Sequence, residues 1–321
     1  RAIPFGTIIM YGSMGETVTE KSGHLNLGVP GIMYLGGFAG FTSAYFYEHN
    51  AANPSALVCV LLSLVCAFLA AMVGGLIYAF LTITLRANQN VTGLALTTFG
   101  MGVANFGGVF LLNGASYTAA PLAFSAYSTK IIPGWDKTGV FGEMFLSYGF
   151  LVYAAILLAV AMHFFLNKTR VGLNLRAVGE SPATADAAGI HVTKYKYLAT
   201  CIGAGISGIG GLYYVLDYNR GIWATTGQIE ALGWLAVALV IFTTWRPLNG
   251  IWGAYLFGML YWLYQYLPNL LGITISNYAI DLVQMIPYVV TIVVLIVVSL
   301  RKKRENQPPA SLGIAYYRED R

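Results

Sequence analysis

The sequence predicts an all-α polytopic membrane protein with about eight to ten transmembrane helices, some short or re-entrant. Of its 321 residues, 57% are apolar and only 10% are charged, whereas soluble domains carry about 25% charged residues. The charges are also clumped, because 49–85, 87–129 and 282–300 contain no Asp, Glu, Lys or Arg. A bilayer helix needs about 20 mostly apolar residues, so these stretches are long enough to cross a membrane.

Nine hydrophobic segments follow one another along the chain. The first is short, and we expect it to be a truncated or re-entrant piece; 231–245 is also short. The third has about 30 residues and would be near 45 Å long as a helix, so it must tilt or project from the hydrocarbon. The segments are 2–14, 30–47, 56–85, 92–112, 144–166, 197–216, 231–245, 250–267 and 279–299.

Lys and Arg set the expected orientation. The run from Arg301 to Arg304 ends the last segment and should be cytoplasmic. Counting back places 167–196 inside, and the outer loops then hold few basic residues. The net charge of +5 therefore lies in short loops and does not indicate nucleic-acid binding. The other basic residues placed inside are Lys21, Arg86, Lys168, Arg170, Arg176, Lys194, Lys196 and Arg246.

These segments define one domain and one tail. Residues 1–300 should form a single transmembrane domain with a cytoplasmic loop at 167–196. Residues 301–321 are basic and then polar, with Pro308 and Pro309, and should form a loose cytoplasmic tail. The chain starts at Arg1 without Met, so we expect residues to be missing at the N-terminus.

Small residues recur at every fourth position in three segments, and such stripes let helix backbones approach closely. The three cysteines, Cys59, Cys66 and Cys201, lie in apolar runs and should be unpaired core residues. The stripes are Ala67, Ala71, Gly75 and Ala79, then Gly100, Ala104 and Gly108, then Ala199, Gly203, Ser207 and Gly211.

The outer stretch 113–143 combines aromatic residues with Pro and Gly. It predicts either a surface cap that serves as a docking surface or a plain connector.

The stretch from Thr19 to Gly31 interrupts two apolar runs with polar and helix-breaking residues. Irregular backbone near a membrane survives only if it is buried in protein or lines a wet cavity. The stretch therefore either lines a path, through residues such as Asn26, or forms a packed cytoplasmic turn. A lone His24 is a weak metal indication, and we predict no metal site.

A short capped helix is predicted inside the basic loop. Ser181 is a good N-cap, Pro182 suits the first helical position, and Gly189 suits the position after the end. The Ala-rich run between them is too short to span a membrane. A capped helix at the cytoplasmic surface indicates a lever presented to another protein, although a purely decorative helix remains an alternative.

A few further polar residues lie in or near apolar segments. Asp281 and Gln284 are three apart and share one helical face, and ionisable groups in a membrane are functional candidates. Asp281 could equally cap its helix. Asn88, Asn90 and Asn105 could bind a neutral polar solute along a path or bridge helices.

Several catalytic motifs are absent. The sequence has no Walker A phosphate loop, no His-Glu-x-x-His and no Gly-x-Ser-x-Gly. Buried carboxylates are too few to indicate a proton relay. The chain is therefore expected to form a passage and not an enzyme.

Two motifs carry a family resemblance over about residues 5–300. Glu20-Lys-Ser-Gly-His-Leu-Asn-Leu-Gly28 resembles a signature of permease subunits of ABC importers. The stretch from Thr169 to Ile190 resembles the cytoplasmic loop of that family. Ala236–Gly250 and Pro287–Leu295 are similar to its later helices. The nearest group imports nucleosides, and this chain resembles the shorter of its two permeases.

The resemblance implies a mechanism and a set of partners. A second homologous permease would form a heterodimer with this chain in the bacterial cytoplasmic membrane. ATP and Mg would bind a separate ATPase subunit, an external lipoprotein of the basic membrane protein type would deliver the solute, and lipid would surround the pore. This chain would hold no cofactor and bind no nucleic acid. The residues expected to couple to the ATPase are Arg176, Gly179, Glu180, Ser181, Pro182, Asp186 and Gly189.

One position departs from the family pattern. Many relatives have an acidic residue soon after Asn26-Leu-Gly28, where this sequence has Pro30. The departure weakens the case for a gating carboxylate at this place.

Other functions remain open from the residues alone. Within the same superfamily, the solute could be a simple sugar or a branched-chain amino acid. A secondary transporter driven by protons or sodium would need intramembrane carboxylates, for which Asp281 is the one convincing candidate. A membrane scaffold would fit the capped helix but leaves the polar stretch 19–31 without a purpose.

Overall fold

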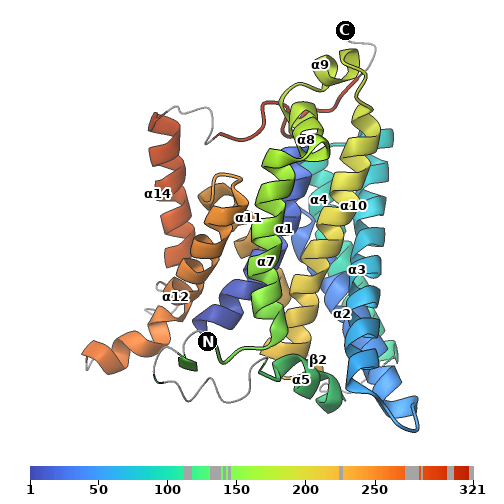
Figure 1. The fold of residues 1–321 in the computed structure, drawn as a ribbon, viewed down its shortest axis with the longest axis vertical. Coiled ribbons are helices and arrows are strands. Elements are labelled where there is room, and N and C mark those ends of the chain that lie inside the picture. Colours follow the sequence, from blue (N-terminus) through green and yellow to red (C-terminus); the bar gives the residue numbers. More distant parts are fainter. Residues whose placement is uncertain are drawn as a thin grey trace.

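The computed structural model describes residues 1–111, 118–130, 139, 142–143, 146–223, 227–271, 282, 285–301 and 307–317. Within these ranges the chain is a bundle of long helices with short elements at both ends (Figure 1). The long helices are α1 (Ala2–Lys21), α2 (Val29–Asn50), α3 (Ala56–Ala79), α4 (Gln89–Leu111), α7 (Phe150–Lys168), α10 (Val192–Tyr213), α11 (Gln228–Phe242), α12 (Pro247–Leu271) and α14 (Ile286–Arg301).

Two of the long helices end in a π-helical turn. Helix α3 continues as η1 (Phe80–Thr84), and α10 continues as η3 (Tyr214–Tyr218). The short helices are α5 (Pro121–Ser128), α8 (Arg170–Glu180) and α9 (Pro182–Ala187). Strand β1 (Thr118–Ala119) pairs antiparallel with β2 (Ile222–Trp223). In Figure 1, α8, α9 and the C-terminus lie at one end of the bundle, and α5 and the N-terminus lie at the other.

The predicted all-α membrane fold is confirmed, and each predicted hydrophobic segment overlaps a helix. Four helices of the described part are long and apolar enough to span a membrane: Ala56–Thr84, Gln89–Phe110, Phe150–Lys168 and Val192–Tyr218. The shorter helix Gln228–Phe242 is also apolar. The chain is therefore a multi-pass membrane protein.

Helix α1 is longer than the predicted first segment, because it runs for 20 residues, and every residue from Phe5 to Glu20 is buried. It packs most extensively against α10 and α12 and also contacts α11 and α7. Helix α1 is thus the centre of the bundle.

The small-residue stripes lie where helices pack closely, as predicted. A methyl group at Gly203 of α10 would overlap the carbonyl oxygen of Gly15 in α1. The stripe on α3 packs against α10, and the stripe on α4 packs against α2. The three cysteines are free, with Cys59 buried and the other two half-buried. Close backbone contact therefore joins α1, α2, α3 and α10.

The described part of the outer stretch 113–143 covers the end of the bundle. Helix α5 packs on α3 and η3. The carboxylate of Glu48 accepts hydrogen bonds from the backbone N–H groups of Leu122 (3.0 Å) and Ala123 (3.3 Å) at the start of α5. These contacts agree with the predicted surface cap.

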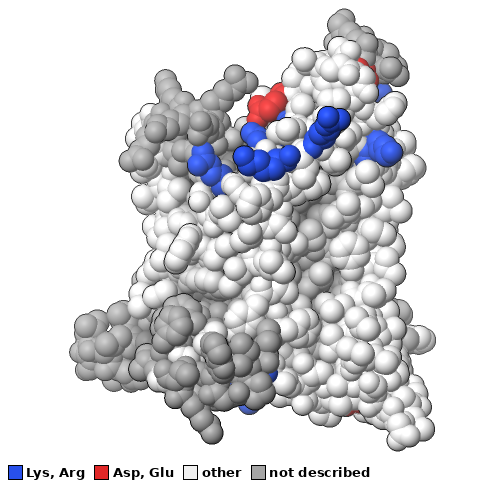
Figure 2. Space-filling model, in the orientation of Figure 1, with Lys and Arg blue, Asp and Glu red and all other residues white. Residues whose placement is uncertain are grey.

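Basic side chains gather at the opposite end. Figure 2 shows Lys and Arg along the end that carries α8 and α9, above a broad uncharged band. The band agrees with the many exposed apolar side chains of α3, α4 and α14.

Candidate coupling site

The turn between α1 and α2 is the most heavily bonded polar feature at the basic end. Ser22, His24 and Asn26 are each at most 1% exposed. The backbone N–H of Leu25 donates to Gln89 Oε1 at 2.8 Å, and Tyr78 donates its hydroxyl hydrogen to the Leu25 carbonyl. Of the two alternatives for this stretch, the structure has the packed turn.

Asn26 stabilises this turn from inside. Its Oδ1 accepts from the backbone N–H of Gly28 at 2.8 Å, and its own backbone N–H donates to Glu16 Oε1 at 2.9 Å. The side chain proposed for a path is therefore engaged in holding the turn against α1.

Two buried carboxyl groups of α1 lie beneath the turn. Glu16 and Glu20 are four residues apart on one helical face and are at most 2% exposed. Trp245, which follows α11, donates its indole N–H to Glu20 Oε2. The sequence motif includes Glu20, but the sequence analysis did not single out Glu16 or Trp245. The spacing of four residues between Glu16 and Glu20 could have indicated that the two carboxyl groups share one helical face.

His24 joins the turn to the end of α3. Its Nε2 lies 2.9 Å from Thr82 Oγ1 in η1. Burial, and secondarily the charge of Lys196, lowers the pKa of His24 to about 3. The imidazole is therefore neutral at physiological pH.

The capped helix in the basic loop forms as predicted. Ser181 is the N-cap of α9 and accepts from the Thr184 N–H at 3.4 Å, and Pro182 occupies the first position. Gly189 follows the helix with φ of +81°, a conformation that favours glycine. Residues within or next to α9 therefore determine where this helix begins and ends.

The C-terminal end of α8 is pressed onto the turn after α1. A Cβ at Gly179 would overlap the carbonyl oxygen of Lys21 and come within 3.1 Å of the Gly23 nitrogen. Helix α8 also contacts α1, α7 and α10. The end of α8 is therefore in direct contact with the end of α1.

The C-terminal tail is docked on the same elements and is not loose as expected. The Ser311 N–H and hydroxyl both donate to the Gly179 carbonyl, at 3.0 and 2.6 Å. The Tyr316 hydroxyl donates to Asp186 Oδ2 at 2.9 Å. The tail therefore connects α8 to α9. Its composition did not predict this, because no local pattern marks the contacts.

The remaining coupling candidates differ in exposure and partners. Arg176 is exposed and donates to Asn167 Oδ1 at 2.9 Å, which ties α8 to the end of α7. Glu180 is exposed. Of the seven predicted residues, Arg176, Gly179, Ser181 and Asp186 make the contacts described above, whereas Glu180 is exposed.

The other path candidates lie apart from this site. Asn88 accepts from the Val91 N–H at 3.1 Å at the start of α4, and Asn90 is exposed in its first turn. Asn105 is half-buried in α4, and its Oδ1 has no hydrogen-bond partner within the described residues. Asp281 and Gln284 lie outside the described residues.

A cavity of about 490 Å³ opens at the end of the bundle opposite α9. Tyr213 at the end of α10 and Asp217 in η3 both line it. Sequence reasoning missed this cavity because aromatic residues are 14% of the chain and none of them stands out. Its aromatic and charged lining includes Tyr148, Tyr213, Asp217, Tyr218, Arg220 and Trp262.

The chain is thus a multi-pass bundle with a buried polar turn and a capped helix at its basic end, and comparison with known proteins shows its class. Residues 2–297 match the family described as branched-chain amino acid transport system / permease component. The chain belongs to this family, and it is a permease component of the ABC transporter class. The predicted resemblance is thereby confirmed.

Curated relatives include permeases for different solutes. A putative glucose ABC transporter permease of Haloferax volcanii is 34% identical over 79% of this chain and 72% of that protein. A guanosine ABC transporter permease of Bacillus subtilis is 34% identical over 77% of this chain and 75% of that protein. A nucleoside ABC transporter permease of Lactococcus lactis is 29% identical over 91% of this chain and 88% of that protein. No solved structure matches this chain.

Proposed function

We propose that this chain is the permease subunit of an ATP-driven importer and forms half of a pathway for a nucleoside-like solute. The observation that carries the proposal is the contact between Gly179 at the end of α8 and the Lys21 carbonyl at the end of α1. It gives a cytoplasmic lever a direct connection to the central helix.

The proposed mechanism starts at α9. An ATPase subunit would bind the surface around Glu180 and α9 and move it when its nucleotide sites close. The movement would reach α1 through Gly179 and the buried turn, where Asn26 is bonded to Glu16. These groups are closely packed, and closely packed elements change between discrete arrangements. A small shift of α9 would therefore favour one of two arrangements of the bundle.

The proposed orientation and partners follow from charge and family. The basic end with α8, α9 and the C-terminus faces the cytoplasm, in accord with the positive-inside rule. A second homologous permease completes the pore, the ATPase with its ATP and Mg binds below, and a solute-binding lipoprotein docks at the end that carries α5.

A nucleoside is the favoured solute. Two relatives are named as guanosine or nucleoside permeases. The cavity near η3 offers tyrosine and tryptophan rings that could stack on a nucleobase and a carboxylate that could bind a ribose hydroxyl. A sugar is the second candidate, favoured by the similarity to the glucose permease. A branched-chain amino acid is the third, favoured by the family description.

The first test is ATP hydrolysis by the chain with its co-expressed partners in nanodiscs. We expect guanosine plus the binding protein to stimulate hydrolysis, and neither to do so alone. Stimulation by glucose or leucine with the binding protein would show that the solute is a sugar or an amino acid and would still support the importer function. The absence of a co-purifying ATPase would contradict the importer and favour an ion-coupled transporter, for which Asp281→Asn is the next variant.

The coupling surface is tested separately. Glu180→Ala and Gly189→Pro should lower transport without lowering solute capture by the external protein. Leu61→Ala, on the exposed face of α3, is the control and should leave transport unchanged. Normal uptake in both coupling variants would contradict the role of α9.

A further inference from the structure

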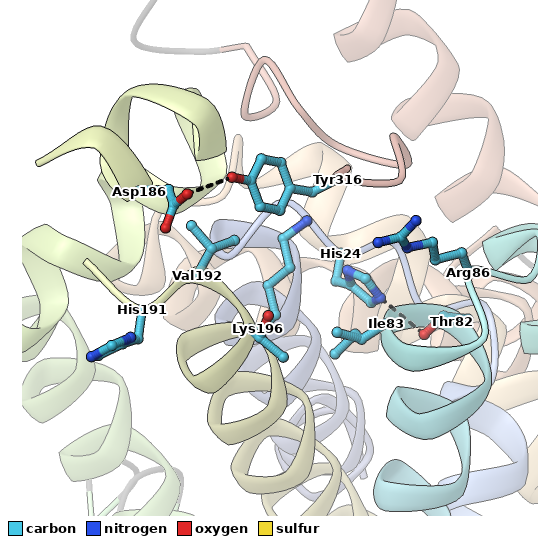
Figure 3. A pocket seen from close by; sticks show the side chains of 10 residues that line it. His24, Thr82, Ile83, Arg86, Asp186, His191, Val192, Lys196 and Tyr316 are labelled. Carbon is cyan, nitrogen blue, oxygen red and sulfur yellow. Dashed lines mark hydrogen bonds between the residues drawn. The ribbon is translucent and has the colours of Figure 1, made fainter. Parts of the chain in front are cut away.

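A polar cavity of about 230 Å³ lies between α9, α10, η1 and the docked tail (Figure 3). It does not belong to the proposed solute pathway, because it opens at the basic end beside the coupling helix. A water molecule occupies about 30 Å³ in the liquid, so the cavity can hold a small ion with several waters. Its polar lining residues are His24, Thr82, Arg86, Asp186, His191, Thr193, Lys196 and Tyr316.

Lys196 is the central group of this cavity. It projects from the first turns of α10, is only 2% exposed, and points its ammonium group into the cavity (Figure 3). Among the described residues, no hydrogen bond or ion pair to this ammonium is found. An ammonium group that is almost entirely removed from bulk water gains from an anion beside it, and the cavity is the space in which such an anion would bind.

A second cation faces the same cavity. Arg86 follows η1 with φ of +58°, a backbone conformation that non-glycine residues seldom adopt. Its guanidinium carbon lies 4.4 Å from the ring centre of Tyr317 in the tail. The acid at the rim, Asp186, accepts a hydrogen bond from Tyr316. The tail therefore covers a cavity that holds two cations.

His24 adds a buried hydrogen-bond acceptor to the site, and an anion without a donor hydrogen cannot bond to it. Thr82 donates its hydroxyl hydrogen to the Tyr78 carbonyl at 2.7 Å, so it accepts from His24 Nε2. This network assigns the proton of the neutral ring to Nε2 and leaves Nδ1 as an acceptor. Nδ1 is buried and has no hydrogen-bond partner in the described part of the chain. The site thus offers two cations and one buried acceptor, and the Asp186 carboxylate lies at its rim, bonded to Tyr316.

We propose that this cavity binds a phosphate group that carries a hydroxyl, as in inorganic phosphate or a phosphate monoester. Lys196 and Arg86 bind its anionic oxygens, and His24 accepts from its hydroxyl. Inorganic phosphate keeps a hydroxyl as its dianion, whereas a phosphate monoester keeps one only as its monoanion, because its second pKa is about 6. A carboxylate or a phosphodiester has no hydroxyl to donate. Because the tail and α9 form the walls, occupancy of the site stabilises the docked tail.

The test uses the purified full chain in maltoside detergent and a phosphate-free buffer. Equilibrium dialysis with radiolabelled phosphate should show one saturable site, and phosphate should raise Tm more than sulfate at equal ionic strength. Lys196→Met should weaken phosphate binding about tenfold or more, as for the loss of a charge-assisted hydrogen bond. The matched control is Lys194→Met, an exposed lysine on the same helix, which should keep the affinity within about twofold.

Stability in phosphate-free buffer separates lost binding from misfolding. There, Lys196→Met should be at least as heat-stable as the wild type, because it replaces an almost completely buried charged side chain with an apolar one of similar length. Arg86→Gln, a change at an exposed side chain, should also weaken binding. Equal affinity of Lys196→Met and Lys194→Met, or no phosphate binding by the wild type, would overturn the proposal. Sulfate as effective as phosphate would overturn the role of His24.

Two further ligands distinguish the source of the phosphate. Adenosine monophosphate should compete with radiolabelled phosphate if a monoester fits the cavity. Phosphatidylglycerol, added as mixed micelles, should not compete. Competition by this lipid alone, lost in Lys196→Met, would overturn the assignment to a hydroxyl-bearing phosphate and indicate a lipid headgroup.

Discussion

Helices α1 and α3 are similar in length but opposite in character. Helix α3 is apolar throughout, and one face is exposed along its whole length, from Leu57 through Leu61 and Val65 to Leu76. Helix α1 carries two carboxyl groups and is buried from Phe5 to Glu20. The more hydrophobic helix is therefore at the periphery, and the more polar helix is at the centre.

The difference follows from the solvent of each helix. Lipid accepts only apolar side chains, so a lipid-facing helix is uniformly hydrophobic. A central helix meets other helices and can bury polar groups that find partners there. Hydropathy therefore identifies the helices that face lipid. Functional polar residues are expected instead in a helix of lower hydropathy, such as α1.

The largest expected effect tests this comparison directly. Ile9→Ala at a fully buried position of α1 should lower the free energy of unfolding by about 2–5 kcal/mol, because it leaves a cavity. Leu61→Ala on α3, where the side chain is 54% exposed, should change it by less than about 0.5 kcal/mol. Thermal unfolding of both variants in detergent measures the difference. Equal losses would show that α3 is as buried as α1.

The next effect concerns the contact between α1 and α10. Gly203→Val should cost about 3 kcal/mol, since its side chain must displace the Gly15 backbone. Gly102→Val on α4 is the matched control, because nothing lies within 4 Å of its added Cβ. Tm and monodispersity on size-exclusion chromatography report the outcome. A stable Gly203→Val protein would contradict the close approach of the two helices.

A smaller effect tests the polar interior of α1. Glu20→Ala removes the acceptor of the Trp245 indole and should destabilise the protein by about 2 kcal/mol, as for an unsatisfied buried donor. Glu20→Gln keeps a carbonyl oxygen and should lose less. Tm of the two variants decides the matter. If both variants lose the same stability, the hydrogen bond from the Trp245 indole does not contribute to the free energy of unfolding, and the carboxyl group of Glu20 stabilises the protein in another way.

Sequence alone predicted the parts of the molecule that depend on local chemistry. Apolar runs gave the helices, and Ser181, Pro182 and Gly189 gave α9. The length of α1 was underestimated because Glu16 and Glu20 interrupt its apolar pattern. The bond between Trp245 and Glu20 joins residues 225 apart in sequence, and Tyr316 reaches Asp186 across 130. Such long-range contacts produce no periodic pattern in the sequence. The buried carboxyl pair and the docked tail therefore became visible only in the structure.

The smallest effect is expected at His24, where the end of α1 meets the end of α3. Its pKa of about 3 lies below the value of about 6.5 for an unfolded chain. Between these values the unfolded state binds more protons, so stability must fall as pH drops below about 6.5. From pH 7.5 to 5.5 the loss should be about 1 kcal/mol. His24→Gln should remove this part of the pH dependence of Tm while keeping a polar group near Thr82. An unchanged slope in the variant would mean that other groups cause the acid sensitivity and that the junction between the two helices is indifferent to protonation.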